Sequence, residues 1–248
     1  EIVPGPARNW NWKGDIRLRN EWRDGEGDAA DAGTGNRVNR QRIRFRYGAE
    51  AKVADTLKAN FRLATGTAGD PVSTNQSFDT NFTKVNTFLD LANVEWSPVT
   101  PGISKLTLVG GIMENPLWMV GPMVFDGDVT LHGAAAKIAQ EMGPVTLFTN
   151  NGVFVLDTNE SETSTLWLTQ VGTTLTLFPD AQEEVLKNMK LTTALAYHDY
   201  MNTYRTGTNK SGTDPLIREA QNNTDSVTDF NQLNPTMELA SMVGGMPV

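Results

Sequence analysis

Basic side chains alternate with apolar side chains in residues 40–62, and this stretch carries the most distinctive chemistry of the sequence. Arginine and lysine bind carboxylates, phosphates and other anions, and several of them on one surface produce a positive field. In a β-strand successive side chains point to opposite faces, so the pattern predicts a hairpin with one charged face and one apolar face. Together with two arginines of an upstream stretch, the predicted basic wall comprises Arg17, Arg19, Arg40, Arg42, Arg44, Arg46, Lys58 and Arg62.

Other chemistries find little support in the residue types. The chain has no cysteine, and His132 and His198 fall in separate predicted strands without the spacing of metal ligands. Asp126-Gly127-Asp128 is typical of a turn, because the rest of a calcium-binding loop is absent. No Gly-x-Ser-x-Gly elbow supports a catalytic triad, and Phe45 and Tyr47 lie opposite the arginines, where they cannot stack bases beside them. We therefore expect no enzyme activity, no metal or other cofactor and no nucleic-acid partner.

The charge is divided unevenly along the 248 residues. The net charge is −8, but residues 1–62 carry a balance of +4 and the remainder a balance of −12. A nucleic-acid-binding domain is normally basic as a whole, so the arginines indicate a local field within an acidic protein. Hydrophobic residues make up 39 % and charged residues 20 % of the chain, which excludes disordered and collagen-like proteins.

Alternation with a period of two continues beyond the hairpin and predicts an all-β fold of about ten antiparallel strands. The predicted strands are 9–23, 40–54, 57–63, 85–96, 105–113, 129–140, 145–156, 165–178, 189–200 and 236–244. The composition of 24–39, 66–83 and 201–234 is that of polar loops, and 179–188 can hold one helical turn. No run approaches the roughly 18 apolar residues of a transmembrane helix.

The predicted connections follow a rule of length. Those after the odd-numbered strands are mostly long, whereas those after the even-numbered strands are shorter. Long loops on one side and short turns on the other are typical of a bacterial outer-membrane β-barrel, which also has aromatic girdles at both interfaces. The aromatic residues near predicted strand ends are Trp10, Trp12, Trp22, Trp96, Trp167 and Tyr197. A soluble antiparallel sandwich also alternates, so this alternative stays open on the pattern alone.

Several segments resemble the putative porins of Gram-negative bacteria: RQRIRFRYG at 40–48, NFRLATG at 60–66, MENPLW at 113–118, and DGDVT at 126–130 followed by GAAAK at 133–137. The resemblance covers essentially the whole chain. It implies an outer-membrane, up-and-down β-barrel that forms a water-filled pore for ions and small hydrophilic solutes. It also implies a homotrimer in contact with outer-membrane lipid and lipopolysaccharide. The first residues, EIVPGP, lack the basic and apolar regions of a signal peptide, so we expect a mature chain whose signal peptide has been removed, or one that never had a signal.

One departure from such barrels concerns the end of the sequence. Outer-membrane barrels usually end in a strand closing on an aromatic residue, whereas this sequence ends at Val248. Members of the family are also longer. We therefore expect residues 1–248 to form a single barrel domain that lacks its C-terminal part, with the strands belonging to a barrel of about 16. The alternative is a closed ten-stranded barrel, whose interior would be narrow.

The apolar connection 114–127 suggests how such a pore narrows. Its apolar residues are predicted to pack on the inner wall, so that Glu114, Asp126 and Asp128 face the basic wall across the opening. Opposed charges of this kind orient solutes and select ions at short range. The alternative is that the arginines pair locally with Asp15, Glu21 and Glu50 and only hold the barrel in shape. The preferred ion stays open, because the arginines favour anions and the overall acidity favours cations.

The rival function is a soluble or surface-exposed β-protein that binds glycans or acts as an adhesin, and extraction distinguishes it from a barrel. We expect the protein to leave membranes only with detergent, because its apolar faces require a lipid-like solvent. We also expect its migration on a denaturing gel to change on heating, since a closed barrel resists detergent until it is unfolded. Solubility in plain buffer would contradict the membrane hypothesis.

Overall fold

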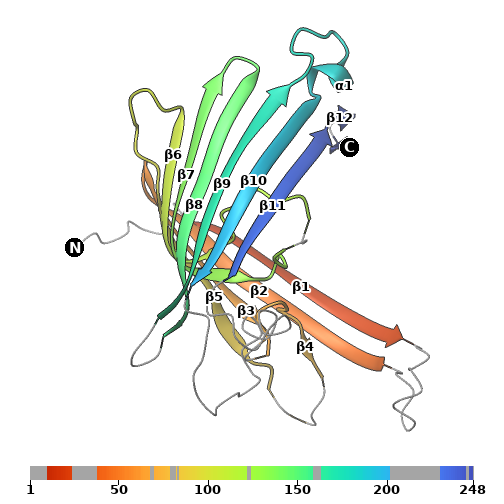
Figure 1. Ribbon diagram of the computed structural model, residues 1–248. Coiled ribbons are helices and arrows are strands. Elements are labelled where there is room, and N and C mark those ends of the chain that lie inside the picture. Colours follow the sequence, from red (N-terminus) through yellow and green to blue (C-terminus); the bar gives the residue numbers. More distant parts are fainter. Residues whose placement is uncertain are drawn as a thin grey trace.

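Successive strands of the chain lie side by side in one curved antiparallel sheet (Figure 1). The computed structural model describes residues 10–23, 38–67, 70–78, 82, 84–121, 124–158, 163–201, 230–243 and 246–247. Its elements are β1 (Trp10–Arg23), β2 (Val38–Ala54), β3 (Leu57–Thr65), β4 (Gln76–Ser77), β5 (Thr87–Trp96), β6 (Lys105–Glu114), β7 (Thr130–Met142), β8 (Val145–Thr158), β9 (Thr163–Thr176), α1 (Glu184–Lys187), β10 (Lys190–Met201), β11 (Phe230–Ala240), β12 (Met242–Val243) and β13 (Met246–Pro247).

The topology of the main sheet is a meander. Its order is β1-β2-β3-β5-β6-β7-β8-β9-β10-β11, and β4 pairs with β2 off this path. The expected antiparallel, up-and-down all-β arrangement is therefore confirmed. β1 and β11 are the two edges, and no pairing joins them within the described ranges, so the structure shows an open curved wall and not a closed barrel.

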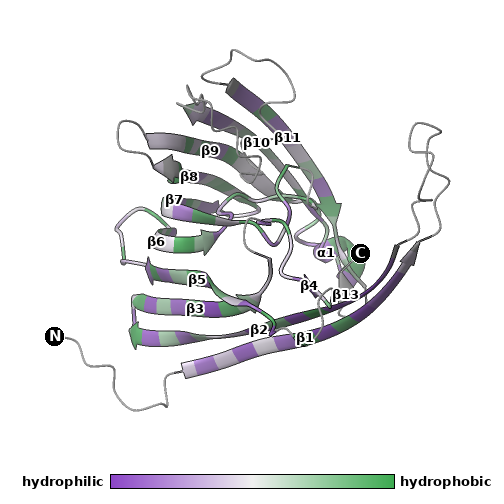
Figure 2. Ribbon diagram, turned by 90° about the horizontal axis from the view of Figure 1, so that it is seen from below, coloured by the Kyte–Doolittle hydropathy of each residue, from purple (hydrophilic) through white to green (hydrophobic). Residues whose placement is uncertain are grey.

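The two faces of the sheet have opposite character. Large apolar side chains on the convex face are exposed to solvent: Ile16, Leu18 and Leu233 are 70, 72 and 65 % exposed. A sheet that uses its apolar face to form a core would bury such residues. Charged and polar side chains alternate with them along β1, β2 and β3 (Figure 2). Along β1–β3 the apolar surface of the wall is therefore outside and its charged surface inside.

Long and short connections separate between the two ends of the sheet. At one end the strands are joined by residues 24–37, 66–86, 115–129, 159–162 and 202–229. At the other end they are joined by residues 55–56, 97–104, 143–144 and 177–189. All but one of the first group are longer than any member of the second, as the sequence pattern predicts.

The aromatic residues lie toward both ends. Trp10, Trp12 and Trp96 are near the short-turn end, whereas Trp22, Trp167 and Tyr197 are nearer the long-loop end. At the first end Trp12 stacks on Trp10 and on Tyr47, with ring centroids 5.6 and 5.4 Å apart. These placements suit two interfacial girdles, whose role in lipid contact stays a prediction.

Two elements differ from the sequence-based expectation. β11 begins at Phe230, six residues before the predicted strand, and it includes Pro235. Proline has no N–H to donate, so it is confined to positions such as an edge strand, and β11 is an edge of the described sheet. β4 lies in a stretch that we expected to be a polar loop, and it pairs with Arg42 and Ile43 of β2.

The predicted helical turn in 179–188 is confirmed by α1, which spans four residues. Within the part of the chain that the structure describes, no helix is long and apolar enough to cross a membrane.

Strand β6 requires glycine at one position on its concave side. Gly111 has a φ of +122°, and a Cβ added there would lie 2.2 Å from the carbonyl oxygen of Ala92. An L side chain is strained by this backbone conformation and also collides with the neighbouring strand. The adjacent Gly110 has ordinary backbone geometry and nothing within 4 Å of its added Cβ.

These two glycines provide a matched test of the local geometry. We expect Gly111→Ala to lower the free energy of unfolding by about 1–3 kcal/mol, whereas Gly110→Ala has little effect. Denaturant unfolding in detergent micelles, followed by tryptophan fluorescence, measures both changes. Equal stability of the two variants would contradict the assigned strain.

Candidate functional site on the concave face

Arginines of β1 and β2 stand directly opposite one another on the concave face. In the register of this pair, Arg17 is opposite Arg44 and Arg19 is opposite Arg42. Like charges in directly opposed positions repel, and their close approach destabilises a sheet. The sheet can hold this ladder only where other groups or water compensate for the repulsion.

Two carboxylates flank the ladder and compensate part of its charge. Asp15 accepts hydrogen bonds from Arg44 and Arg46, with N–O distances of 2.9 and 2.6 Å. Glu21 contacts Arg19 at 3.0 Å and Arg40 at 2.9 Å. This local pairing is the one that the alternative interpretation anticipated for both acids. Glu50 instead pairs with Lys58 at 3.1 Å, close to the short-turn end.

Arg17 and Arg42, in the middle of the ladder, are held by neutral groups of the segment 73–77. Arg17 donates to the side-chain oxygen of Asn75 at 2.6 Å, and Arg42 donates to the Asn75 carbonyl at 3.0 Å. Arg42 also lies 3.3 Å from the hydroxyl of Ser73. Within the described residues neither arginine forms an ion pair with a carboxylate. The centre of the basic wall is therefore the most positive part of the ladder.

The connection 115–129 lies against the concave face (Figure 2). Leu117 and Phe125 belong to a buried cluster with residues of β6, β7, β8, β9 and β10, and Met119 and Val124 pack against it. The backbone of Trp118 is clamped by Gln170, which accepts from its N–H and donates to its carbonyl, both at 2.8 Å. The connection is therefore packed onto the inner wall and is not a free loop.

The three acidic residues predicted to face the basic wall have different partners. Asp128 lies 3.5 Å from Arg46, and its other oxygen accepts from the N–H and the hydroxyl of Thr74, both at 3.1 Å. Glu114 pairs with Arg62 at 2.8 Å, and Arg62 also contacts Asp90 at 2.5 Å.

Asp126 is exposed and accepts from the backbone N–H of Asp128 at 2.9 Å, which is turn chemistry. The structure thus brings Asp128 and Glu114 to arginines and gives Asp126 a local role in shaping the turn.

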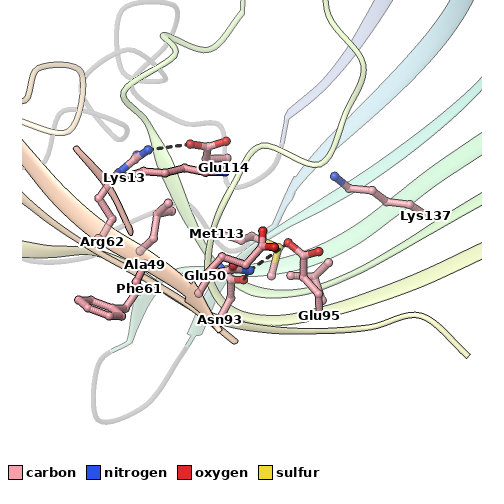
Figure 3. Close-up of a pocket in the computed structure, with 14 residues that line it drawn as sticks. Lys13, Ala49, Glu50, Phe61, Arg62, Asn93, Glu95, Met113, Glu114 and Lys137 are labelled. Atoms are coloured by element: carbon pink, nitrogen blue, oxygen red, sulfur yellow. Dashed lines mark hydrogen bonds and ion pairs between the residues drawn. The ribbon is translucent and has the colours of Figure 1, made fainter. Parts of the chain in front are cut away.

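Two cavities follow the concave face toward the short-turn end. One of about 330 Å³ is lined by residues that include Arg62, Glu114, Glu50, Glu95 and Lys137 (Figure 3). A second of about 390 Å³ is lined by residues that include Trp118, Phe148, Glu95 and Lys137. Their mixed charges suit polar solutes and water.

The two histidines lie on opposite faces of the sheet and cannot share a ligand. His132 is exposed on the convex face, whereas His198 is fully buried on the concave face, where its ring is 5.7 Å from that of Phe125.

A comparison with family models identifies the protein family of the chain. Residues 30–243 match the model of the family described as putative porin. The chain belongs to this family. Membership in this family suggests a channel-forming porin and implies the outer membrane. Members of the family are typically non-enzymatic. A search of curated proteins found no match.

Several residues of this porin-family site were not predicted from the sequence. In the sequence, residues 73–75 look like part of an ordinary polar loop. Only the hydrogen bonds that Arg17 and Arg42 donate to Asn75 in the structure show that this segment belongs to the site. Gln170 carries a weak signal, because it is a polar residue that directly follows two leucines, Leu166 and Leu168, on the inner face of β9. Glu95 and Lys137 occupy concave-face positions in the alternating pattern of β5 and β7, but nothing else in the sequence singles them out.

The clamp on Trp118 leads to a prediction about the inward connection. Gln170→Leu removes both hydrogen bonds to the backbone and leaves buried polar groups without partners, so the free energy of unfolding should fall by about 1–3 kcal/mol. Thr169→Leu, on the convex face of the same strand, is the control and should be nearly neutral. Thermal unfolding followed by circular dichroism measures both. An equally stable Gln170→Leu protein would show that the clamp does not hold the connection.

Proposed function

We propose that the protein is an outer-membrane porin through which ions and small hydrophilic solutes diffuse passively. The observation that carries this proposal is the inverted sheet of a porin-family chain. Its exposed convex face is apolar, as contact with lipid requires, and its concave face holds the charges. A glycan-binding or adhesive soluble protein has no comparable use for such a convex face.

The closed state of this wall is a barrel, in which the concave face becomes the lumen. The curvature of the sheet and its two free edges support closure, and the mixed charges of the two cavities suit a water-filled interior. Assembly as a homotrimer in contact with lipid and lipopolysaccharide follows from the resemblance to porins and is part of the proposal.

The narrowest part of the lumen lies between the basic wall and the inward connection. The packing of 115–129 on the inner wall supports this, as do the contacts of Asp128 with Arg46 and of Glu114 with Arg62. Arginines with neutral partners, Arg17 and Arg42, give the basic side its excess charge. In a partly desolvated opening a fixed field of this kind discriminates between ions by sign.

Ion selectivity in planar lipid bilayers tests the role of the basic wall. We expect the double variant Arg42→Ala/Arg44→Ala to shift the reversal potential in a salt gradient toward cations. Loss of two positive charges should raise the cation-to-anion permeability ratio by a factor of about 3 to 10. An unchanged ratio would refute a selective basic wall.

Lys52→Ala is the matched control, because it also removes a positive charge from β2. Lys52 lies at the short-turn end, where it pairs with Asp55 at 2.8 Å and its side chain is 56 % exposed. The hydrogen bond from Lys52 lowers the pKa of Asp55 below its ordinary value. We expect this variant to leave the permeability ratio unchanged, because its charge is already paired and screened outside the narrow part.

A further inference from the structure

Glu95 of β5 and Lys137 of β7 stand at the junction of the two cavities. Both residues line the cavity of about 330 Å³ beside Arg62 and the cavity of about 390 Å³ beside Trp118. No other lining residue is common to these two cavities. Glu95 and Lys137 are therefore placed to contact a solute that lies at the boundary between the two cavities.

The backbone register sets the spacing between them. Glu95 is opposite Val109 of β6, and Lys137 is opposite Thr107 of the same strand. The two residues are thus two strands apart and offset by two positions, which is roughly 10 Å across the sheet and roughly 7 Å along it. Both side chains line the cavity from the same concave wall, with β6 between their strands (Figure 3).

These two charges are available, whereas their neighbours are occupied. Arg62 is paired with Asp90 and Glu114, and Glu50 is paired with Lys58. Within the described residues Glu95 and Lys137 form no ion pair with each other or with a third group. The carboxylate of Glu95 is oriented by Asn60, which donates to it at 3.1 Å and to the side chain of Asn93 at 2.9 Å.

We infer that Glu95 and Lys137 form a subsite for zwitterionic solutes of amino-acid size. The inference rests on the proposed channel and specifies its substrate class. The ammonium group of the solute contacts the carboxylate of Glu95, and its carboxylate contacts the ammonium group of Lys137. A simple cation or anion gains from one of these residues and is repelled by the other, whereas a zwitterion gains from both.

The closest competing explanation is that Glu95 and Lys137 attract each other and narrow the passage without binding a solute. In that case both charges reduce the flow of every solute alike. A binding subsite instead favours zwitterions over uncharged molecules of the same size. The two explanations therefore differ in a ratio of permeabilities and not only in a rate.

Swelling of liposomes that contain the full-length protein measures this ratio with L-alanine as the zwitterion and lactamide as an uncharged molecule of similar size. We expect the wild-type protein to admit alanine at least about fivefold faster than lactamide, because each of its two charge contacts is worth up to about that factor in water. Glu95→Gln and Lys137→Gln should each lower the ratio several-fold while lactamide still enters. Lys52→Gln, at the short-turn end, should keep the wild-type ratio.

The exchanged double variant Glu95→Lys/Lys137→Glu provides the decisive check. It should recover the preference for alanine, because the zwitterion then binds in the reverse orientation. A wild-type ratio near one, or single variants that retain the preference, would overturn the subsite but leave the channel intact. Failure of both solutes to enter with the wild-type protein would overturn the channel, and the subsite with it.

Discussion

The repulsion between opposed guanidinium groups of β1 and β2 is the constraint around which the concave face is arranged. Arg17 and Arg44, and likewise Arg19 and Arg42, occupy positions where a sheet normally places opposite charges or neutral groups. They cannot turn to the convex face, because alternation would then carry the apolar residues of β1 inward. Asp15 and Glu21 compensate the ends of this ladder, and polar groups of other segments hold its middle.

Two connections from distant parts of the sequence meet at this ladder. The segment 73–77 is held by Arg17 and Arg42, and Thr74 within it is bonded to Asp128 at the end of the second connection. That second connection is packed by Leu117 and Phe125 against strands on the other side of the wall. Asp128 therefore links the charged half of the interior to its apolar half, and the two connections brace each other across the concave face.

Much of the fold was predictable, because a strand with one apolar and one polar face leaves its period in the sequence. The residues of β1, β2 and β9 show this period directly, and the lengths of the connections predicted the two ends of the sheet. The start of β11 was not predictable, since Asn234 and Pro235 resemble a loop and only an edge position makes the proline harmless. The partners of the arginines were harder still. Asp15 and Glu21 lie on β1 beside its arginines and reach those of β2 through the pairing of the two strands, but Asn75 and Asp128 reach the ladder through long-range packing that no local pattern encodes.

The short strand β4 has a consequence for how such a wall can change over time. β3 pairs with β2 only as far as Arg46, and beyond that point the neighbour of β2 is Gln76–Ser77, which belongs to a connection. Part of the inner surface is therefore formed by residues 76–77, which belong to the connection between β3 and β5 and not to a long strand of the sheet. Insertions or deletions between residues 66 and 73 can accumulate without shifting the register of any long strand. The chemistry of the concave face, and with it the permeability of the proposed channel, can thus change under mutation separately from the stability of the sheet.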